Sequence, residues 1–199
     1  VGEGWFEVGV LVDPLGAITL FFVAITILAI FVYSVGYHNY GQPEGDHDRP
    51  GLPPHGATVT DKQGHSHKVL SIEPMYSRFF AFIGLFAFGM YLLVLSDNLL
   101  TMFVGWEIMG LCSYLLIGFW YGKPSARAAM IKAFLTTRVG DVFMLLGIAY
   151  LYSSTGTLNF RAILYNEEVL HSLAEHSSGF LELSVAGLIA LLLFIGTVG

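Results

Sequence analysis

The chain has 199 residues, of which 55% are hydrophobic and only 12% are charged, and its mean hydropathy is +0.67. These values exclude an ordinary soluble domain and indicate an integral membrane protein. The net charge of −6 says little as a total, because the distribution of the charges matters more; we expect no nucleic-acid partner.

Five hydrophobic stretches are each about long enough to cross a bilayer as a helix. They cover residues 14–36, 77–96, 97–120, 129–152 and 180–199. The sequence therefore predicts an all-α integral membrane fold that forms one transmembrane domain over residues 1–199. The last stretch stops inside an apolar run, so we expect a truncated fifth helix in a fragment of a longer multi-pass protein.

Two polar segments separate these spans. Residues 41–74 form a loop rich in Gly, Pro and His, in which His65 and His67 are weak candidates for a metal site. A solvated loop is the favoured interpretation, because a His-x-His pair without a further spaced ligand is a weak zinc signal. Residues 159–176 have apolar side chains at helical spacing opposite glutamates, which predicts an amphipathic helix on the outer membrane surface.

The distribution of lysine and arginine predicts the orientation of the chain in the membrane. Basic residues flank the 41–74 and 121–128 connections, whereas the opposite side has Arg161 as its one basic residue, together with several glutamates. We therefore expect both connections to face the cytoplasm, or an equivalent matrix or stroma, and the N-terminus to lie outside.

Three ionisable residues lie near the middle of the third and fourth spans: Glu107 in the third, Arg138 and Asp141 in the fourth. Charges in hydrocarbon are costly, so such residues are functional candidates by default. Arg138 and Asp141 are three residues apart and can pair on one helix face. Glu107 has no basic residue in its own helix, so its partner has to come from another span.

Structural interpretations compete with this one. Arg138 and Asp141 can form an ion pair that only fixes helix packing, and Glu107 can be a buried carboxyl that only bonds to a neighbouring helix. Lys132 is either an anchor at the inner end of its helix, which is the favoured interpretation, or the entrance of a proton path. We expect Glu107, Arg138 and Asp141 to carry proton translocation, with Lys132 as a weaker candidate.

Around these residues the sequence resembles a known family. The Gly-Trp-Glu sequence at 105–107, Thr-Arg-Val-Gly-Asp at 137–141 and Gly-Thr-Leu-Asn-Phe at 156–160 are similar to the antiporter-like subunit L (chain 5) of respiratory complex I. The resemblance implies an inverted-repeat helix bundle in which Glu107 is the glutamate of a central Lys–Glu pair. It also implies that Arg138 and Asp141 form the neighbouring charged pair, and that the lysine follows residue 199.

The resemblance implies a proton-translocating subunit of NADH:quinone oxidoreductase, an enzyme whose redox centres lie in other chains. NADH, FMN, iron–sulfur clusters and quinone are then expected in partner subunits. Other complex I membrane subunits, especially the neighbouring antiporter-like one, are the expected protein partners. A sodium/proton antiporter subunit and a structural membrane anchor are the alternatives. A bacterial cell membrane is favoured over mitochondrial inner or thylakoid membranes.

Overall fold

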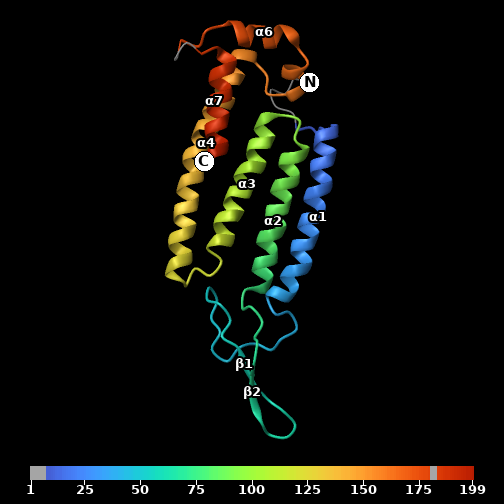
Figure 1. Cartoon of the computed structure of the whole chain (residues 1–199), viewed down its shortest axis with the longest axis vertical. Helices are drawn as coiled ribbons and strands as arrows, with labels where there is room; N and C mark the ends of the chain where they lie inside the picture. Colours follow the sequence, from blue (N-terminus) through green and yellow to red (C-terminus); the bar gives the residue numbers. More distant parts are fainter. Residues whose placement is uncertain (1–7, 180–182) are drawn as a thin grey trace, which may run out of the picture.

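The computed structural model describes residues 8–179 and 183–199, and it is mostly helical. Helices α1, α2, α3 and α4 run side by side along the long axis, and the shorter α7 packs against α4 (Figure 1). Their bounds are Pro14–Tyr37, Tyr76–Leu95, Leu99–Ile117, Pro124–Thr155 and Val185–Val198. The helical membrane architecture predicted from hydropathy is therefore confirmed.

Local sequence explains where these helices begin. The Asp13 side chain accepts a hydrogen bond from the Gly16 amide at 2.6 Å, and Pro14 occupies the first turn of α1. Asn98 caps α3 in the same way, by accepting from the Thr101 amide at 2.8 Å. Both side chains satisfy amides that a helix start leaves without partners.

Four of the described helices, α1 to α4, are long and apolar enough to cross a membrane. Within the described residues, the fifth predicted span corresponds to α7, an apolar helix of 14 residues, while residues 180–182 lie outside the description. Helix α4 is longer than the predicted 129–152 because it begins at Pro124, where the missing proline N–H costs nothing.

The segment predicted as one amphipathic helix over 159–176 is instead two helices, α5 (Phe160–Leu164) and α6 (Glu167–Glu175). Asn159 and Asn166 each accept hydrogen bonds from two amides at a helix start. The second cap lies inside the predicted helix and restarts it, because an asparagine in this position favours a new N-terminus.

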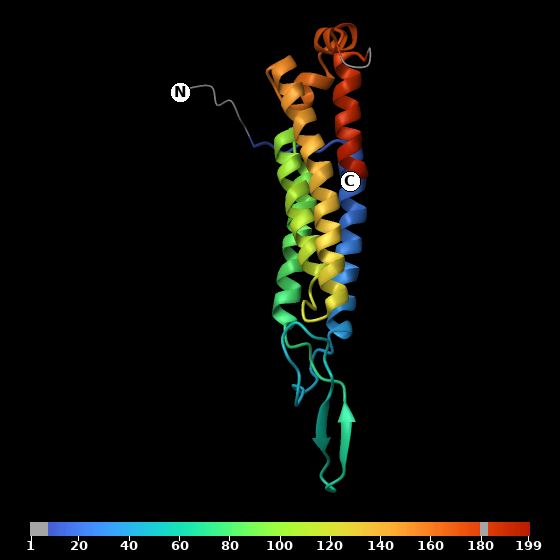
Figure 2. The same cartoon turned by 90° about the vertical axis from the view of Figure 1, so that its left-hand side faces the viewer.

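The 41–74 connection also contains structure that the sequence did not predict. Strands β1 (Ala57–Thr60) and β2 (Ser66–Val69) form an antiparallel hairpin with Ala57 opposite Val69. The hairpin extends beyond the helices at the end opposite to α6 (Figure 2). The connection between α3 and α4 lies at the hairpin end as well, where the Gly122 amide donates to the Gly51 carbonyl at 2.7 Å.

The main hydrophobic core lies toward the other end of the molecule, where α3, α4, α5, α6 and α7 meet. It is built from Leu99, Met144, Ile148, Leu151, Ile163, Leu173, Val185 and Ile189. Helix α1 takes little part in it: Ser34 is its one buried residue. An apolar helix with most of its surface exposed suits a lipid environment or packing against further membrane helices.

Candidate functional site in the membrane helices

The candidate site lies between the middle of α3 and the middle of α4. The Arg138 Nη1 atom forms ion pairs with both Glu107 and Asp141, at 3.0 Å from the Asp141 carboxylate. The pair between Arg138 and Asp141 spans one helical turn, whereas the contact with Glu107 joins two helices. One cation therefore bridges two carboxylates that come from neighbouring membrane helices.

A tryptophan holds the second carboxylate in place. The Trp106 indole N–H donates to Asp141 at 2.9 Å, and Asp141 is only 6% exposed. Trp106 and Glu107 are adjacent residues of α3. Trp106 bonds to Asp141 directly, and Glu107 is linked to Asp141 through Arg138. The Arg–Asp pair was predictable from spacing, but the Trp106 hydrogen bond was not, because it depends on how α3 faces α4.

The surroundings of the Arg138 guanidinium fit a large planar cation. It lies over the Phe134 ring at 4.8 Å from the centroid, an arrangement in which the ring face attracts the charge. A Cβ atom on Gly110 would lie 3.0 Å from the Arg138 Nη2 atom, so glycine leaves the space that the side chain occupies. These contacts orient Arg138 toward both carboxylates.

Asp141 also lines a cavity of about 300 Å³ between α2, α3, α4 and the end of α7. Ser113 and Thr137 add hydroxyl groups to a lining that is otherwise mostly apolar and that includes Gly199. Of the three ion-paired residues, Asp141 therefore borders on a space between the helices. Glu107 and Arg138 are partly exposed, with 33% and 24% of their side-chain surface accessible.

The weaker candidates lie apart from this group. Lys132 is exposed on α4, six residues and roughly 9 Å of helix rise from Arg138 toward the hairpin end. His67 lies on β2, opposite Val59, and His65 precedes that strand. Among the described residues, no group of three or more His, Cys, Asp or Glu side chains could hold a metal ion.

Comparisons with known proteins agree on one family. A family described as "NADH:quinone oxidoreductase/Mrp antiporter, TM" matches residues 96–197, which is just over half of the chain. The chain is 36% identical over 197 residues to the NAD(P)H-quinone oxidoreductase chain 5 of Synechocystis sp., covering 99% of this chain and 24% of that protein. The matched family region includes the three ion-paired residues Glu107, Arg138 and Asp141.

Two bacterial relatives extend the comparison. Subunit L of the NADH-quinone oxidoreductase of Rhodobacter capsulatus is 38% identical over 191 residues, which is 96% of this chain and 23% of that protein. Subunit L of Escherichia coli is 58% identical over 92 residues, which is 46% of this chain and 15% of that protein. The chain thus spans about a quarter or less of the length of the curated relatives it matches.

Proposed function

The chain belongs to the NADH:quinone oxidoreductase/Mrp antiporter membrane family, and from this we propose that it forms part of a proton-translocating subunit of NADH:quinone oxidoreductase. The observation that carries the proposal is the bridge from Arg138 to Glu107 and Asp141. Ionisable residues in membrane helices are rare and mark ion or proton pathways.

The chemistry of the bridge supports transfer of protons. An arginine side chain remains protonated in proteins, so the variable protons belong to the two carboxylates. The group carries a net charge of −1 when both are ionised and is neutral when one is protonated. These two states differ by one proton.

Each residue has a distinct role in this proposal. Glu107 is the proton-loading carboxylate, Arg138 is the fixed cation, and Asp141 is the second anion that competes for Arg138. When one of the two carboxylates is protonated, Arg138 is left paired with the remaining charged one. Such a change has a large effect because Coulomb interactions are strong where the dielectric constant is low. Lys132 is the candidate entrance to the path from the hairpin end.

The redox steps belong to other chains in this account. The sequence contains no motif for a flavin, an iron–sulfur cluster or a quinone, so we assign NADH, FMN, iron–sulfur clusters and quinone to partner subunits. Further membrane subunits, including a neighbouring antiporter-like one, are the proposed protein partners. The family also covers Mrp antiporters, but the relatives above are named as quinone oxidoreductase subunits, which favours the redox-driven pump.

Purification of the tagged full-length protein from its native membrane tests this assignment. We expect NADH-oxidising and quinone-reducing subunits to copurify, and NADH addition to drive proton transport after reconstitution. Copurification with membrane subunits alone, together with sodium-dependent proton exchange that needs no NADH, would contradict the proposal and indicate an antiporter.

A further inference from the structure

A second group of buried polar side chains lies at the hairpin end, outside the membrane helices. Glu73 precedes α2 and is only 2% exposed. Its carboxylate accepts hydrogen bonds from the Trp120 indole N–H at 3.1 Å and from the Met75 amide at 3.4 Å. No basic side chain of residues 8–179 and 183–199 forms an ion pair with it. Glu73 is therefore a buried carboxyl without a compensating cation, which disfavours its charged form.

Glu73 is nevertheless connected to the aqueous surface. It lines a cavity of about 680 Å³, whose wall also includes Glu44, Arg78 and Tyr121. These three residues are exposed, so one continuous space links the buried carboxyl to solvent. The cavity lies beyond the last turn of α3, the helix that carries Glu107, at a helix distance on the order of 20 Å from that residue.

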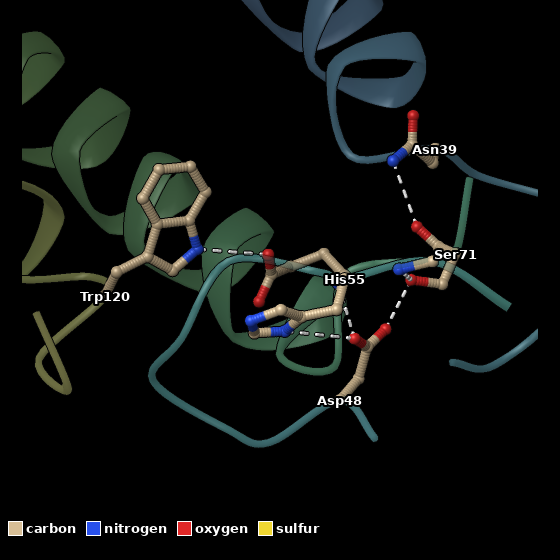
Figure 3. Close-up of polar contacts among 7 residues, drawn as sticks. Asn39, Asp48, His55, Ser71 and Trp120 are labelled. Atoms are coloured by element: carbon tan, nitrogen blue, oxygen red, sulfur yellow. Dashed lines mark hydrogen bonds and ion pairs between the residues drawn. The ribbon is translucent and has the colours of Figure 1, made fainter. Parts of the chain in front are cut away.

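The neighbouring Asp48 carboxylate has the opposite environment. It lines the same cavity and accepts hydrogen bonds from the Ser71 hydroxyl and from the His55 amide, the latter at 2.6 Å (Figure 3). The His55 ring lies 3.6 Å from the same carboxylate. Burial raises the pKa of Asp48, but these partners outweigh it and leave that pKa below its usual value. Asp48 is thus held ionised.

The environment of Glu73 acts in the other direction. Burial raises the pKa of Glu73, and the negative charge of Asp48 raises it further, while the hydrogen bonds from Trp120 and Met75 oppose the shift. The pKa values of the two carboxyl groups on this cavity are therefore shifted in opposite directions. Asp48 is shifted toward the ionised form and Glu73 toward the protonated form. Such divergence is a common feature of sites that bind and release protons.

The remaining neighbours of Glu73 are consistent with a neutral carboxyl. The His38 carbonyl at the end of α1 accepts from the Glu73 amide at 3.2 Å. The His38 ring is buried among aromatic rings, 3.9 Å from the Phe79 centroid, and its burial lowers its pKa. Arg78 and Tyr76 on α2 line the cavity, and the Tyr76 amide donates to the Glu73 backbone carbonyl at 3.0 Å. Among the described residues, neither side chain forms an ion pair or hydrogen bond with the Glu73 carboxylate. Among the residues that the structure describes, no cation is therefore ion-paired with Glu73 to hold it ionised.

We propose that this cavity is a proton-binding vestibule in which Glu73 takes up a proton from the aqueous phase, with Asp48 as the fixed negative charge and Trp120 as a positioning residue. Uptake forms an O–H bond on one Glu73 oxygen and neutralises the carboxylate, and release returns the proton to water. The delivery of this proton from Glu73 to the membrane helices rests on the function proposed above. The binding of the proton to Glu73 does not.

The test is an infrared pH titration of the full-length protein in its assembled complex, which follows the carbonyl band of protonated carboxyl groups. Glu73→Gln should remove one titrating carboxyl that is present in the wild type. Trp120→Phe should move the midpoint of that band to higher pH. The Trp120 hydrogen bond stabilises the ionised form of Glu73, so its removal raises the pKa of Glu73. Asp61→Asn, which removes an exposed carboxylate in the hairpin turn, should leave the Glu73 component of the band and its midpoint unchanged.

Identical titrations of wild type and Glu73→Gln would overturn the proposal, and so would an unshifted midpoint in Trp120→Phe. Both readouts are independent of pumping. If the band behaves as expected in a complex that does not pump protons, the vestibule stands and the proposed function fails. If pumping is intact but the band does not respond, the vestibule alone is wrong.

Discussion

At the scale of single residues, the two charged groups of this chain differ in how their carboxylates are balanced. In the membrane helices, Arg138 compensates Glu107 and Asp141 directly. At the hairpin end, Asp48 is balanced by hydrogen bonds from Ser71 and His55, while Glu73 has hydrogen bonds but no ion pair within the described residues. The first arrangement keeps charge inside the membrane, and the second favours a neutral carboxyl next to water.

The hydrogen bonds of Asp48 make a prediction about pH. Because its pKa is lowered by folding, the stability that Asp48 provides is present above its unfolded-state pKa and is lost as the pH falls through its folded-state pKa. We expect Asp48→Asn to weaken the local structure by about 1–3 kcal/mol at neutral pH, with the difference from wild type shrinking in acid.

Hydrogen exchange of the His55 amide, which donates to Asp48 at 2.6 Å, provides the measurement. Protection of this amide should fall in Asp48→Asn at neutral pH and approach the wild-type protection at low pH. Asp61→Asn serves as the matched control, because its carboxylate caps the hairpin turn instead. An equal loss of protection at both pH values would show that the charge of Asp48 is not the cause.

At the scale of elements, glycines set the distance between α2 and α3. A Cβ atom on Gly105 would lie 2.8 Å from the Leu93 amide nitrogen and 2.9 Å from the Gly89 carbonyl oxygen. These are backbone atoms that cannot rotate away. Small residues permit this close approach, which is how many membrane helices pack, and it keeps the neighbouring Glu107 at a fixed position relative to the bundle.

Replacing Gly105 by alanine should therefore push α2 and α3 apart. We expect Gly105→Ala to lower the melting temperature of the purified complex, by an amount corresponding to about 1–3 kcal/mol of overpacking. Gly84→Ala on α2 is the matched control, because a Cβ there meets nothing within 4 Å. In a helix alanine is favoured over glycine, so the control should be neutral or stabilising. Equal melting temperatures for the two variants would refute the packing role of Gly105.

Sequence patterns predicted the elements better than the contacts between them. Hydropathy located the spans, and the predicted start of the first one at residue 14 agrees with the start of α1 at Pro14, because hydropathy is a local signal. The Asn166 cap that divides α5 from α6 was also present in the sequence, where an asparagine followed by two glutamates is a recognisable helix start. The contact of Arg138 with Glu107 and the burial of Glu73 could not be predicted, since both depend on which helix faces meet.

At the scale of the whole molecule, the bundle has two distinct ends. The hairpin end carries most of the basic residues and the Glu73 cavity, and the other end carries α5, α6 and the hydrophobic core (Figure 1). From the distribution of lysine and arginine we propose that the hairpin end is the inner one. In this account protons enter near Glu73 and are loaded on Glu107, roughly midway along α3.

In the proposed mechanism Glu107 carries a proton during turnover, and Glu107→Gln removes this ability. Glutamine keeps the size and the hydrogen-bonding ends of the side chain but cannot ionise. If Glu107 only served packing, this change would be nearly neutral, because an amide is cheaper to bury than a carboxylate. Glu167→Gln, on an exposed residue at the start of α6, provides the matched control.

The measurement is the number of protons transported per electron in vesicles that contain the assembled complex, driven by NADH, at equal subunit content. We expect Glu107→Gln to abolish or sharply lower this ratio while assembly is retained, and Glu167→Gln to leave it at the wild-type value. An unchanged ratio in a fully assembled Glu107→Gln complex would contradict the account.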